Sequence, residues 1–232
     1  YNGYSLDLHK LSKELYRVTV PGGVCACVIN DGTKDFAKSL TTFRMAVDWV
    51  DNDNWKLFET VIYQRHGKPG GWWSTRFRVD HEYILIFFKG DKPRHFDKEH
   101  LAVPSKSAYR KTWSGTTRRT DVDFDVVDKV AINEMKCLGT IWNYHASNTE
   151  NNKLKLQHPA TFPDDMASDL IRCFTKEGDT VLDPTCGSGT TAVLAGRHGR
   201  HYIGMDISSE YVKLAKERIG RETQRTVFES DD

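Results

Sequence analysis

The chain has 232 residues, enough for one sizeable α/β domain with an insertion, whereas a second independent core would be difficult to accommodate. The formal net charge is only +1, but Gln64 to Thr120 contains thirteen Lys or Arg against five Asp or Glu. Such a segment can face a polyanion or can be an ordinary solvated surface, and the spacing of the charged residues does not distinguish the two. The five cysteines include no C-x-x-C pair, the histidines show no zinc spacing, and neither a membrane span nor a secretory leader is visible, so we expect no metal, no disulfides and a reducing cytoplasm.

The first hundred residues predict two helices and three strands. Apolar residues at helical spacing predict a helix over Ser5–Val18, with Ser5 as its N-cap. The apolar, β-branched run Val24–Asn30 predicts a buried strand of a parallel sheet. A second helix is expected over Ala37–Val50, followed by strands over Trp55–Gln64 and His81–Phe88.

From Lys89 to about Gln157 the apolar pattern dissolves into polar, basic and Ser/Thr-rich sequence, which predicts an irregular, partly mobile insertion. Regular structure is expected again after it. The patterns predict a helix over 164–174, a strand over 180–183, a helix over 190–198 that ends at Gly199, a strand over 201–206 and a last helix over 209–218.

A glycine-rich turn, "DTVLDPTCGSGTT", joins the strand that ends at Asp183 to the next helix. Gly187 and Gly189 permit positive φ angles and close approach of a ligand, and the free N–H groups of the helix can donate to it. Asp206 closes the next strand, 17 residues past Gly189, where a carboxylate can accept both hydroxyls of a ribose. Because Gly187-x-Gly189-x-x-Ala192 also satisfies the dinucleotide fingerprint, a nicotinamide-dependent dehydrogenase remains an alternative.

Two further features favour S-adenosylmethionine as the ligand. Asp183 precedes the loop, where it would repel a pyrophosphate but could accept from a cationic amino-acid head. Only one strand and one helix follow the loop, so the rest of the sheet must come from earlier in the chain, in a circularly permuted order. The alternative is a purely structural role, in which the glycines only permit a tight turn and Asp206 is a solvated residue at the end of a strand.

These motifs resemble a known family. "HPATFPDDMASDLI" followed by "GDTVLDPTCGSGTTAVLAGRHGRHYIGMDISSEY" is similar to motifs X, I and II of the β-class, circularly permuted S-adenosylmethionine-dependent DNA amino-methyltransferases, which act on adenine N6 or cytosine N4. "ELYRVTVPGGVCACVINDG" and "ETVIYQRHGKPGGWW…DHEYILIFFKG" resemble earlier parts of that family, so the resemblance covers about 160 of the 232 residues. It implies a Rossmann-like α/β sheet, mostly parallel with an antiparallel hairpin strand, in permuted order and with an irregular insertion.

The resemblance also implies which residues bind S-adenosylmethionine. Residues of the loop would surround the methionine moiety, Asp206 would hold the ribose, and Thr161 to Pro163 would close over the cofactor. Phe162 could equally be core packing. The implied set comprises Asp31, Thr161, Phe162, Pro163, Asp183, Pro184, Thr185, Gly187, Gly189, Thr190, Thr191, Asp206 and Ile207.

The catalytic D/S/N-P-P-Y/F/W tetrapeptide of that family is absent, since none of the seven prolines is adjacent to another. In the family it lies shortly before the helix that begins near Ser5, so we expect its segment upstream of residue 1. Tyr1 in place of Met favours this explanation; supply by another chain and a catalytically inactive cofactor- and nucleic-acid-binding module are the alternatives. No catalytic residue can therefore be named, and the choice between adenine and cytosine stays open.

The expected partner is double-stranded DNA, whose target base must be flipped out to reach the cofactor. Cations interleaved with aromatics suit phosphate contact and base stacking, and residues 90–157 are the expected target-recognition insertion. Two of the candidates have plain alternatives, since Trp72 and Trp73 could cap the hairpin and Tyr63 could simply pair across strands. A homodimer, a companion restriction endonuclease and a prokaryotic or phage source accord with the family resemblance. The candidate DNA-binding residues are Tyr63, Trp72, Trp73, Arg76, Arg78, Arg110, Lys111, Arg118 and Arg119.

Overall fold

The computed structural model describes residues 6–66, 77, 79–106, 110, 112–118, 124–145 and 163–228. The chain divides into two compact units, a main unit of residues 1–97 and 140–232 and a small unit of residues 98–139. Within the described residues, no helix has the length and apolar character needed to cross a bilayer.

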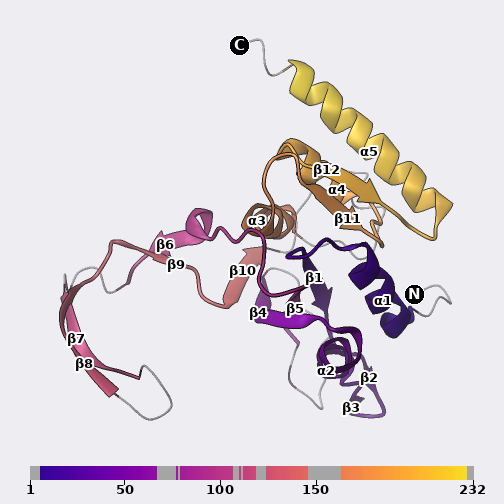
Figure 1. Ribbon diagram of the computed structural model, residues 1–232. Helices are drawn as coiled ribbons and strands as arrows, with labels where there is room; N and C mark the ends of the chain where they lie inside the picture. The colour runs from indigo at the N-terminus through magenta and orange to yellow at the C-terminus, as the bar shows by residue number, and fades with distance from the viewer. Residues whose placement is uncertain are drawn as a thin grey trace. The chain divides into compact units, whose positions relative to one another are not determined.

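The larger sheet of the main unit has the strand order β1 (Val24–Ile29), β5 (His81–Phe88), β4 (Lys56–His66) and β10 (Ile141–His145), which Figure 1 shows side by side. β5 pairs antiparallel with β1 and with β4, whereas β4 pairs parallel with β10. Three strands therefore run in one direction and β5 runs against them. This mixed α/β arrangement confirms the predicted fold class.

A second, parallel pair of strands follows late in the chain. β11 (Thr180–Asp183) pairs with β12 (His201–Gly204), and α4 (Thr190–Arg197) connects them as in a βαβ unit. α3 (Asp164–Phe174) precedes this unit and α5 (Ser209–Phe228) follows it. The strands around the glycine loop thus come after the larger sheet, which is the permuted order that the sequence predicts.

An aromatic core holds the first helices against the larger sheet. α1 (Leu8–Val18) and α2 (Thr41–Asp53) contribute Leu15, Met45 and Trp49 to a buried cluster that also contains Trp55 and Phe87. The rings of Trp49 and Phe87 lie 4.9 Å apart, a contact that adds to the burial of apolar area. Leu182 of β11 packs against the same cluster, as do Cys25, Cys27 and Ile29 of β1.

Both first helices begin later than predicted. α1 starts at Leu8, because Asp7 is its N-cap and its side chain accepts a hydrogen bond from the Lys10 N–H at 3.1 Å. The predicted cap Ser5 lies outside the described residues. The helix expected from Ala37 is wrong in its first turn, since Thr33–Lys34 (β2) and Ala37–Lys38 (β3) form a small hairpin and Leu40 is left-handed with φ 56°.

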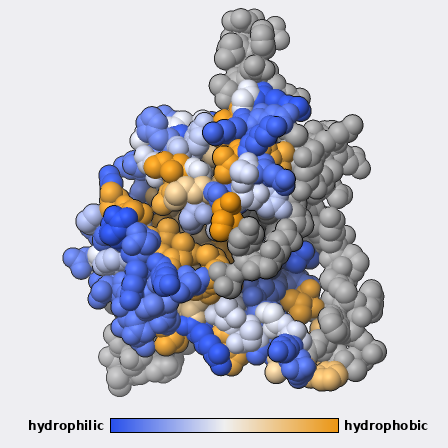
Figure 2. Space-filling view, turned by 90° about the vertical axis from the view of Figure 1, so that its right-hand side faces the viewer, coloured by the Kyte–Doolittle hydropathy of each residue, from blue (hydrophilic) through white to orange (hydrophobic). Residues whose placement is uncertain are grey.

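The strand Val24–Ile29 also differs from its prediction. We expected a buried strand with parallel neighbours, but it pairs with the antiparallel β5, and its residues are mostly half-buried. The reason is its position, since in the described part of the chain β1 has a strand on one side only. Among the described strands β11 likewise pairs with β12 alone, and β12 is exposed along its whole length. Apolar residues that reach the surface appear as orange patches among polar ones in Figure 2.

The small unit contains regular strands where an irregular insertion is predicted. A short 3₁₀ turn, η1 (Glu99–Leu101), leads into β6 (Ala102–Pro104), which pairs with β9 (Met135–Cys137); β7 (Thr112–Arg118) pairs with β8 (Phe124–Ala131). The segment "TWSGTTR" has no run of aliphatic residues, so its β structure depends on Thr and Trp, which favour strands without marking a core. β10, which the same prediction covered, belongs to the larger sheet.

Candidate functional site

The glycine loop is a tight, buried turn between β11 and α4. Gly187 and Gly189 have φ angles of 49° and 78°, the left-handed region that glycine enters without steric cost. A Cβ on Gly189 would lie 2.9 Å from the Cβ of Ala215 in α5. Glycine is therefore required at position 189 for two reasons, its left-handed backbone angle and the close packing of the loop on α5.

Asp206 lies directly beside this loop. Its Oδ2 accepts a hydrogen bond from the Gly187 N–H at 2.9 Å, and its Oδ1 accepts from the Ser208 N–H at 2.9 Å. The Cys186 N–H also donates to the Met205 carbonyl at 2.8 Å. Because each carboxylate oxygen has more than one acceptor site, Asp206 keeps capacity for ligand hydroxyls while its orientation is fixed.

Asp183 provides a second carboxylate, at the end of the neighbouring strand. Its Oδ2 accepts from the Thr191 hydroxyl at 2.6 Å and its Oδ1 from the Thr185 N–H at 3.0 Å. Burial, followed by the negative charges of Asp183 and Asp206, raises the pKa of the Cys186 thiol to about 11. The thiol is therefore neutral at physiological pH, and the field in the loop is negative, which suits a cationic ligand and opposes a pyrophosphate.

Arg218, which no sequence pattern singled out, fastens the loop from α5. Its Nη1 donates to the Thr190 hydroxyl at 2.8 Å and to the Ser188 carbonyl at 3.3 Å, and its Nη2 lies 3.6 Å from Asp164 Oδ1. The side chain is only 3% exposed, and this burial lowers its pKa. Contacts that span about 30 to 54 residues of sequence leave no local pattern, so only the structure identifies this residue.

The family is decided by comparison with known proteins. The sequence model of a family described as DNA methylase matches residues 1–217. The chain belongs to this family. It is an S-adenosylmethionine-dependent DNA methyltransferase, and its target is the exocyclic amino group of adenine (N6) or of cytosine (N4).

Curated relatives of this methyltransferase cover nearly its whole length. The orphan methyltransferase M.BamHII of Bacillus amyloliquefaciens is 36% identical over 230 residues, which is 94% of this chain and 83% of that protein. The Type II methyltransferase M.MjaI of Methanocaldococcus jannaschii is 30% identical over 236 residues, 97% of this chain and 70% of that protein.

Solved structures show the same fold. The cytosine-N4-specific PvuII DNA methyltransferase has a TM-score of 0.68 at 18% identity, covering 97% of this chain and 79% of its own. TTHA0409 of Thermus thermophilus, a putative DNA modification methylase complexed with S-adenosyl-L-methionine, has a TM-score of 0.61 at 23% identity, covering 93% and 76%. At these identities the likeness concerns the fold of the methyltransferase.

Several other residues of the expected cofactor set have structural partners of their own. Thr190 is buried and its hydroxyl accepts from Arg218, so it stabilises the loop from inside. Asp31 accepts from the Thr42 N–H at 2.9 Å and thereby caps α2. Pro163 is buried at the N-cap of α3. Thr161 and Phe162 lie outside the described residues.

Ile207, directly after Asp206, is 75% exposed. An exposed apolar side chain next to a carboxylate is suited to van der Waals contact with a base. Thr185 is exposed and Pro184 is half-buried, both on the loop between Asp183 and Gly187.

Few of the expected DNA-binding residues belong to the described part of the chain. Tyr63 is 3% exposed and pairs with Glu82 and Trp142, so in this structure it packs between strands. Arg110 is exposed in the small unit, and Arg118 ends β7, where only the backbone is described. The remaining candidates lie outside the described residues: Trp72, Trp73, Arg76, Arg78, Lys111 and Arg119.

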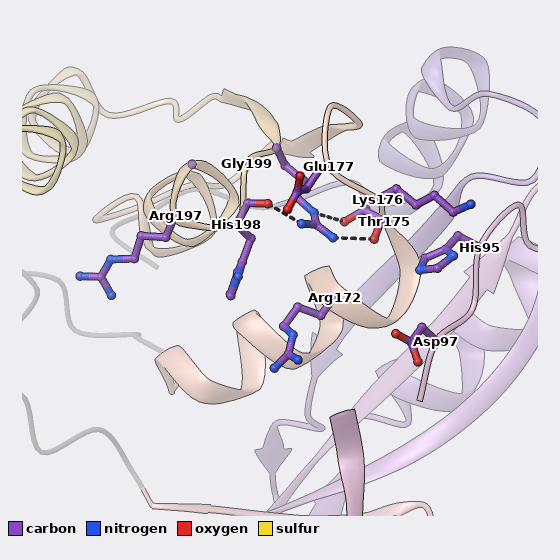
Figure 3. Close-up of a pocket in the computed structure, with 11 residues that line it drawn as sticks. His95, Asp97, Arg172, Thr175, Lys176, Glu177, Arg197, His198 and Gly199 are labelled. Carbon is purple, nitrogen blue, oxygen red and sulfur yellow. Dashed lines mark hydrogen bonds between the residues drawn. The ribbon is translucent and has the colours of Figure 1, made fainter. Parts of the chain in front are cut away.

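A basic hollow of about 800 Å³ lies near the other end of β11 and β12. Figure 3 shows Arg172, Arg197 and His198 among its lining residues, and Arg200 donates to the Thr175 hydroxyl at 3.0 Å and to the Thr175 carbonyl at 2.8 Å. These residues lie before β11 or between the last residue of α4 and β12, at the amino ends of the two strands. Asp183 is the last residue of β11 and Asp206 follows β12, so both carboxylates lie at the carboxyl ends. The hollow is therefore separate from the glycine loop.

Proposed function

We propose that this methyltransferase holds S-adenosylmethionine at the carboxyl ends of β11 and β12. The observation that carries the proposal is the pair of strand-end carboxylates beside the glycine loop, with Asp206 2.9 Å from the Gly187 N–H. Asp206 would accept the ribose hydroxyls, and Ile207 would contact the adenine. Asp183 and Thr191, joined by a 2.6 Å hydrogen bond, would face the methionine end. Ligands of open α/β sheets bind at this edge.

The chemistry of the site fits the cofactor. When bound, S-adenosylmethionine supplies an electrophilic methyl group on a sulfonium cation. The chain contributes the negative charges of Asp183 and Asp206 and a loop backbone, held by hydrogen bonds to both carboxylates, that would fix the donor in place. Because the Cys186 thiol is buried and protonated, the target amino nitrogen would bond to the methyl directly. The carbon–sulfur bond of the sulfonium would break in the same step, leaving a neutral thioether, and the nitrogen would lose one proton.

We further propose that the strand bearing the catalytic D/S/N-P-P-Y/F/W tetrapeptide lies between β1 and β11, supplied from upstream of residue 1. In the described residues each of these strands has an unpaired edge. Leu182 of β11 and Cys27 of β1 also pack against one aromatic cluster, so both strands border the same core. The unpaired N–H and C=O groups of a strand edge are a template for the pairing of one more strand. The aromatic of that tetrapeptide would stack on the flipped base.

We assign target recognition to residues 90–157, which include the small unit of residues 98–139. The stretch Gln64–Thr120 carries an excess of eight positive charges, and Arg110 is exposed within it. Contacts to phosphates would position double-stranded DNA without specifying a sequence.

Two partners and one compartment complete the proposal. The Methanocaldococcus jannaschii relative is described as a Type II methyltransferase, which supports a companion restriction endonuclease for this one as well. A homodimer is the second partner, testable by light scattering of the natural full-length protein. The proposed compartment is a reducing cytoplasm, which agrees with five cysteines that form no disulfide.

Calorimetric titration of S-adenosylmethionine tests the site. Asp206→Ala and Asp183→Ala should each weaken binding at least tenfold, because each removes a carboxylate that ligand and loop share. Glu177→Ala, which removes an exposed charge before β11, is the matched control and should bind like wild type. Equal affinity in all four proteins would place the cofactor elsewhere.

A further inference from the structure

A cluster of three possible metal ligands lies where α1 packs on α2, apart from the glycine loop. His9 belongs to α1, and Asp48 and Asp53 belong to α2. One ligand atom from each lies within 4.8 Å of the others. His9 Nδ1 is 3.1 Å from Asp48 Oδ2 and 3.6 Å from Asp53 Oδ2.

Asp53 is the member of the cluster that needs a partner. Its side chain is 1% exposed, and neither of its carboxylate oxygens has a hydrogen-bond partner in the described part of the chain. It is also the last residue of α2, where the negative end of the helix dipole disfavours a second negative charge. A buried carboxylate in this position is strongly unfavourable unless a cation neutralises it.

Asp48 is oriented for the same centre. Its Oδ1 accepts a hydrogen bond from Asn52 Nδ2 at 2.8 Å, which leaves Oδ2 directed toward His9. Asn52 thus resembles the outer partners that fix the ligands of metal sites in proteins.

The distances from His9 to each acid match those between ligands that share one ion. Zinc binds imidazole nitrogen and carboxylate oxygen at about 2.1 Å, so two ligands of a tetrahedral centre are about 3.4 Å apart. The observed separations of 3.1 and 3.6 Å lie on either side of this value. His9 is 44% exposed, which leaves a path for the ion and room for a water as the fourth ligand.

We propose that His9 Nδ1, Asp48 Oδ2 and Asp53 Oδ2 bind one divalent transition-metal cation, with zinc as the best match. The ion would join α1 to α2 and neutralise Asp53, and it would stabilise the folded state without touching the cofactor loop. Sequence patterns do not indicate the site, because His9 and the two acids are about forty residues apart. A protonated His9 that pairs with both acids is the competing explanation.

The test uses the natural full-length protein, without an affinity tag and stripped with a chelator. Zinc titration by calorimetry should show one tight equivalent, and zinc should raise the thermal midpoint. Asp53→Asn and His9→Gln should each lose at least tenfold in affinity, and Asn52→Ala should lose about tenfold through its effect on Asp48. Asp51→Asn, which removes an exposed charge from the same helix, is the matched control and should bind like wild type.

Cobalt absorption separates this site from the cysteines. Co²⁺ in the proposed site should give weak visible bands without the strong near-ultraviolet band of thiolate ligation, and His9→Gln, an exposed position that should still fold, should abolish them. Zinc affinity that is equal in wild type, Asp53→Asn and His9→Gln would overturn the proposal. A thiolate band would do the same, and so would a thermal midpoint that falls in His9→Gln but does not respond to zinc.

Discussion

Replacing Arg218 with methionine tests whether the cofactor loop depends on its attachment to α5. The Arg218 guanidinium is 3% exposed and contacts the Thr190 hydroxyl, the Ser188 carbonyl and the Asp164 carboxylate. Methionine keeps much of the volume but removes every donor, so the loop hydroxyl and carbonyl lose their partner.

The magnitude follows from those contacts. An unsatisfied buried polar group costs about 1–3 kcal/mol, and Asp164, being about a third exposed, recovers most of its interaction from water. Arg218 Nε has no hydrogen-bond partner among the residues that the structure describes, and removing the guanidinium recovers that cost. We therefore expect a loss of about 2–4 kcal/mol in the free energy of unfolding, less than the sum of the separate contacts.

Urea unfolding and calorimetric titration of S-adenosylmethionine measure the two effects of Arg218→Met. Besides the loss of stability, the cofactor should bind at least tenfold more weakly, because Ser188 and Thr190 are no longer held. Arg221→Met, which breaks an exposed pair with Glu217 on the same helix, should stay close to wild type in both assays. If Arg218→Met matched that control, the reasoning about the loop would be refuted.

Three further predictions concern single residues. Cys186 should resist alkylation at pH 8 while the exposed Cys137 reacts, as peptide mass mapping would show, and fast labelling of Cys186 would contradict the prediction. Because the folded-state pKa of Cys186 is raised to about 11, its contribution to the free energy of unfolding should fall as pH rises from about 9 toward 11. Gly189→Ala should lower both stability and cofactor affinity, because the new Cβ would clash at 2.9 Å with Ala215, and unchanged titrations would show that the loop can shift. Trp49→Ala, at a fully buried site of the aromatic core, should cost about 3–5 kcal/mol by denaturant unfolding, and a loss below about 1 kcal/mol would mean that this core does not hold α2.

The elements predicted best are those whose signals are local. The helix over 164–174 and the strand over 180–183 agree with α3 and β11 at both ends, because apolar spacing and flanking turn residues lie within the segments. The predicted start of α2 is wrong because Ala37 and Lys38, which have high helical propensity, pair with Lys34 and Thr33 in a short hairpin instead.

The candidate site divides in the same way. The glycine loop and Asp206 could be joined from sequence, because 17 residues of a βαβ unit return the chain to the adjacent strand end. Arg218 and the cluster at Asp53 could not, since the partners of Arg218 are about 30 to 54 residues away, His9 is about forty residues from the two acids, and no periodicity links them. The open edge of β1 also depends on which strands are neighbours, and apolar composition does not report it.

The most direct test of the account is methyl transfer by the natural full-length protein from labelled S-adenosylmethionine to unmethylated DNA, followed by mass spectrometry of the nucleosides. The account predicts label in N6-methyladenine or in N4-methylcytosine, and its loss in Asp206→Ala but not in Glu177→Ala. Label in neither nucleoside, or full transfer by Asp206→Ala, would contradict it.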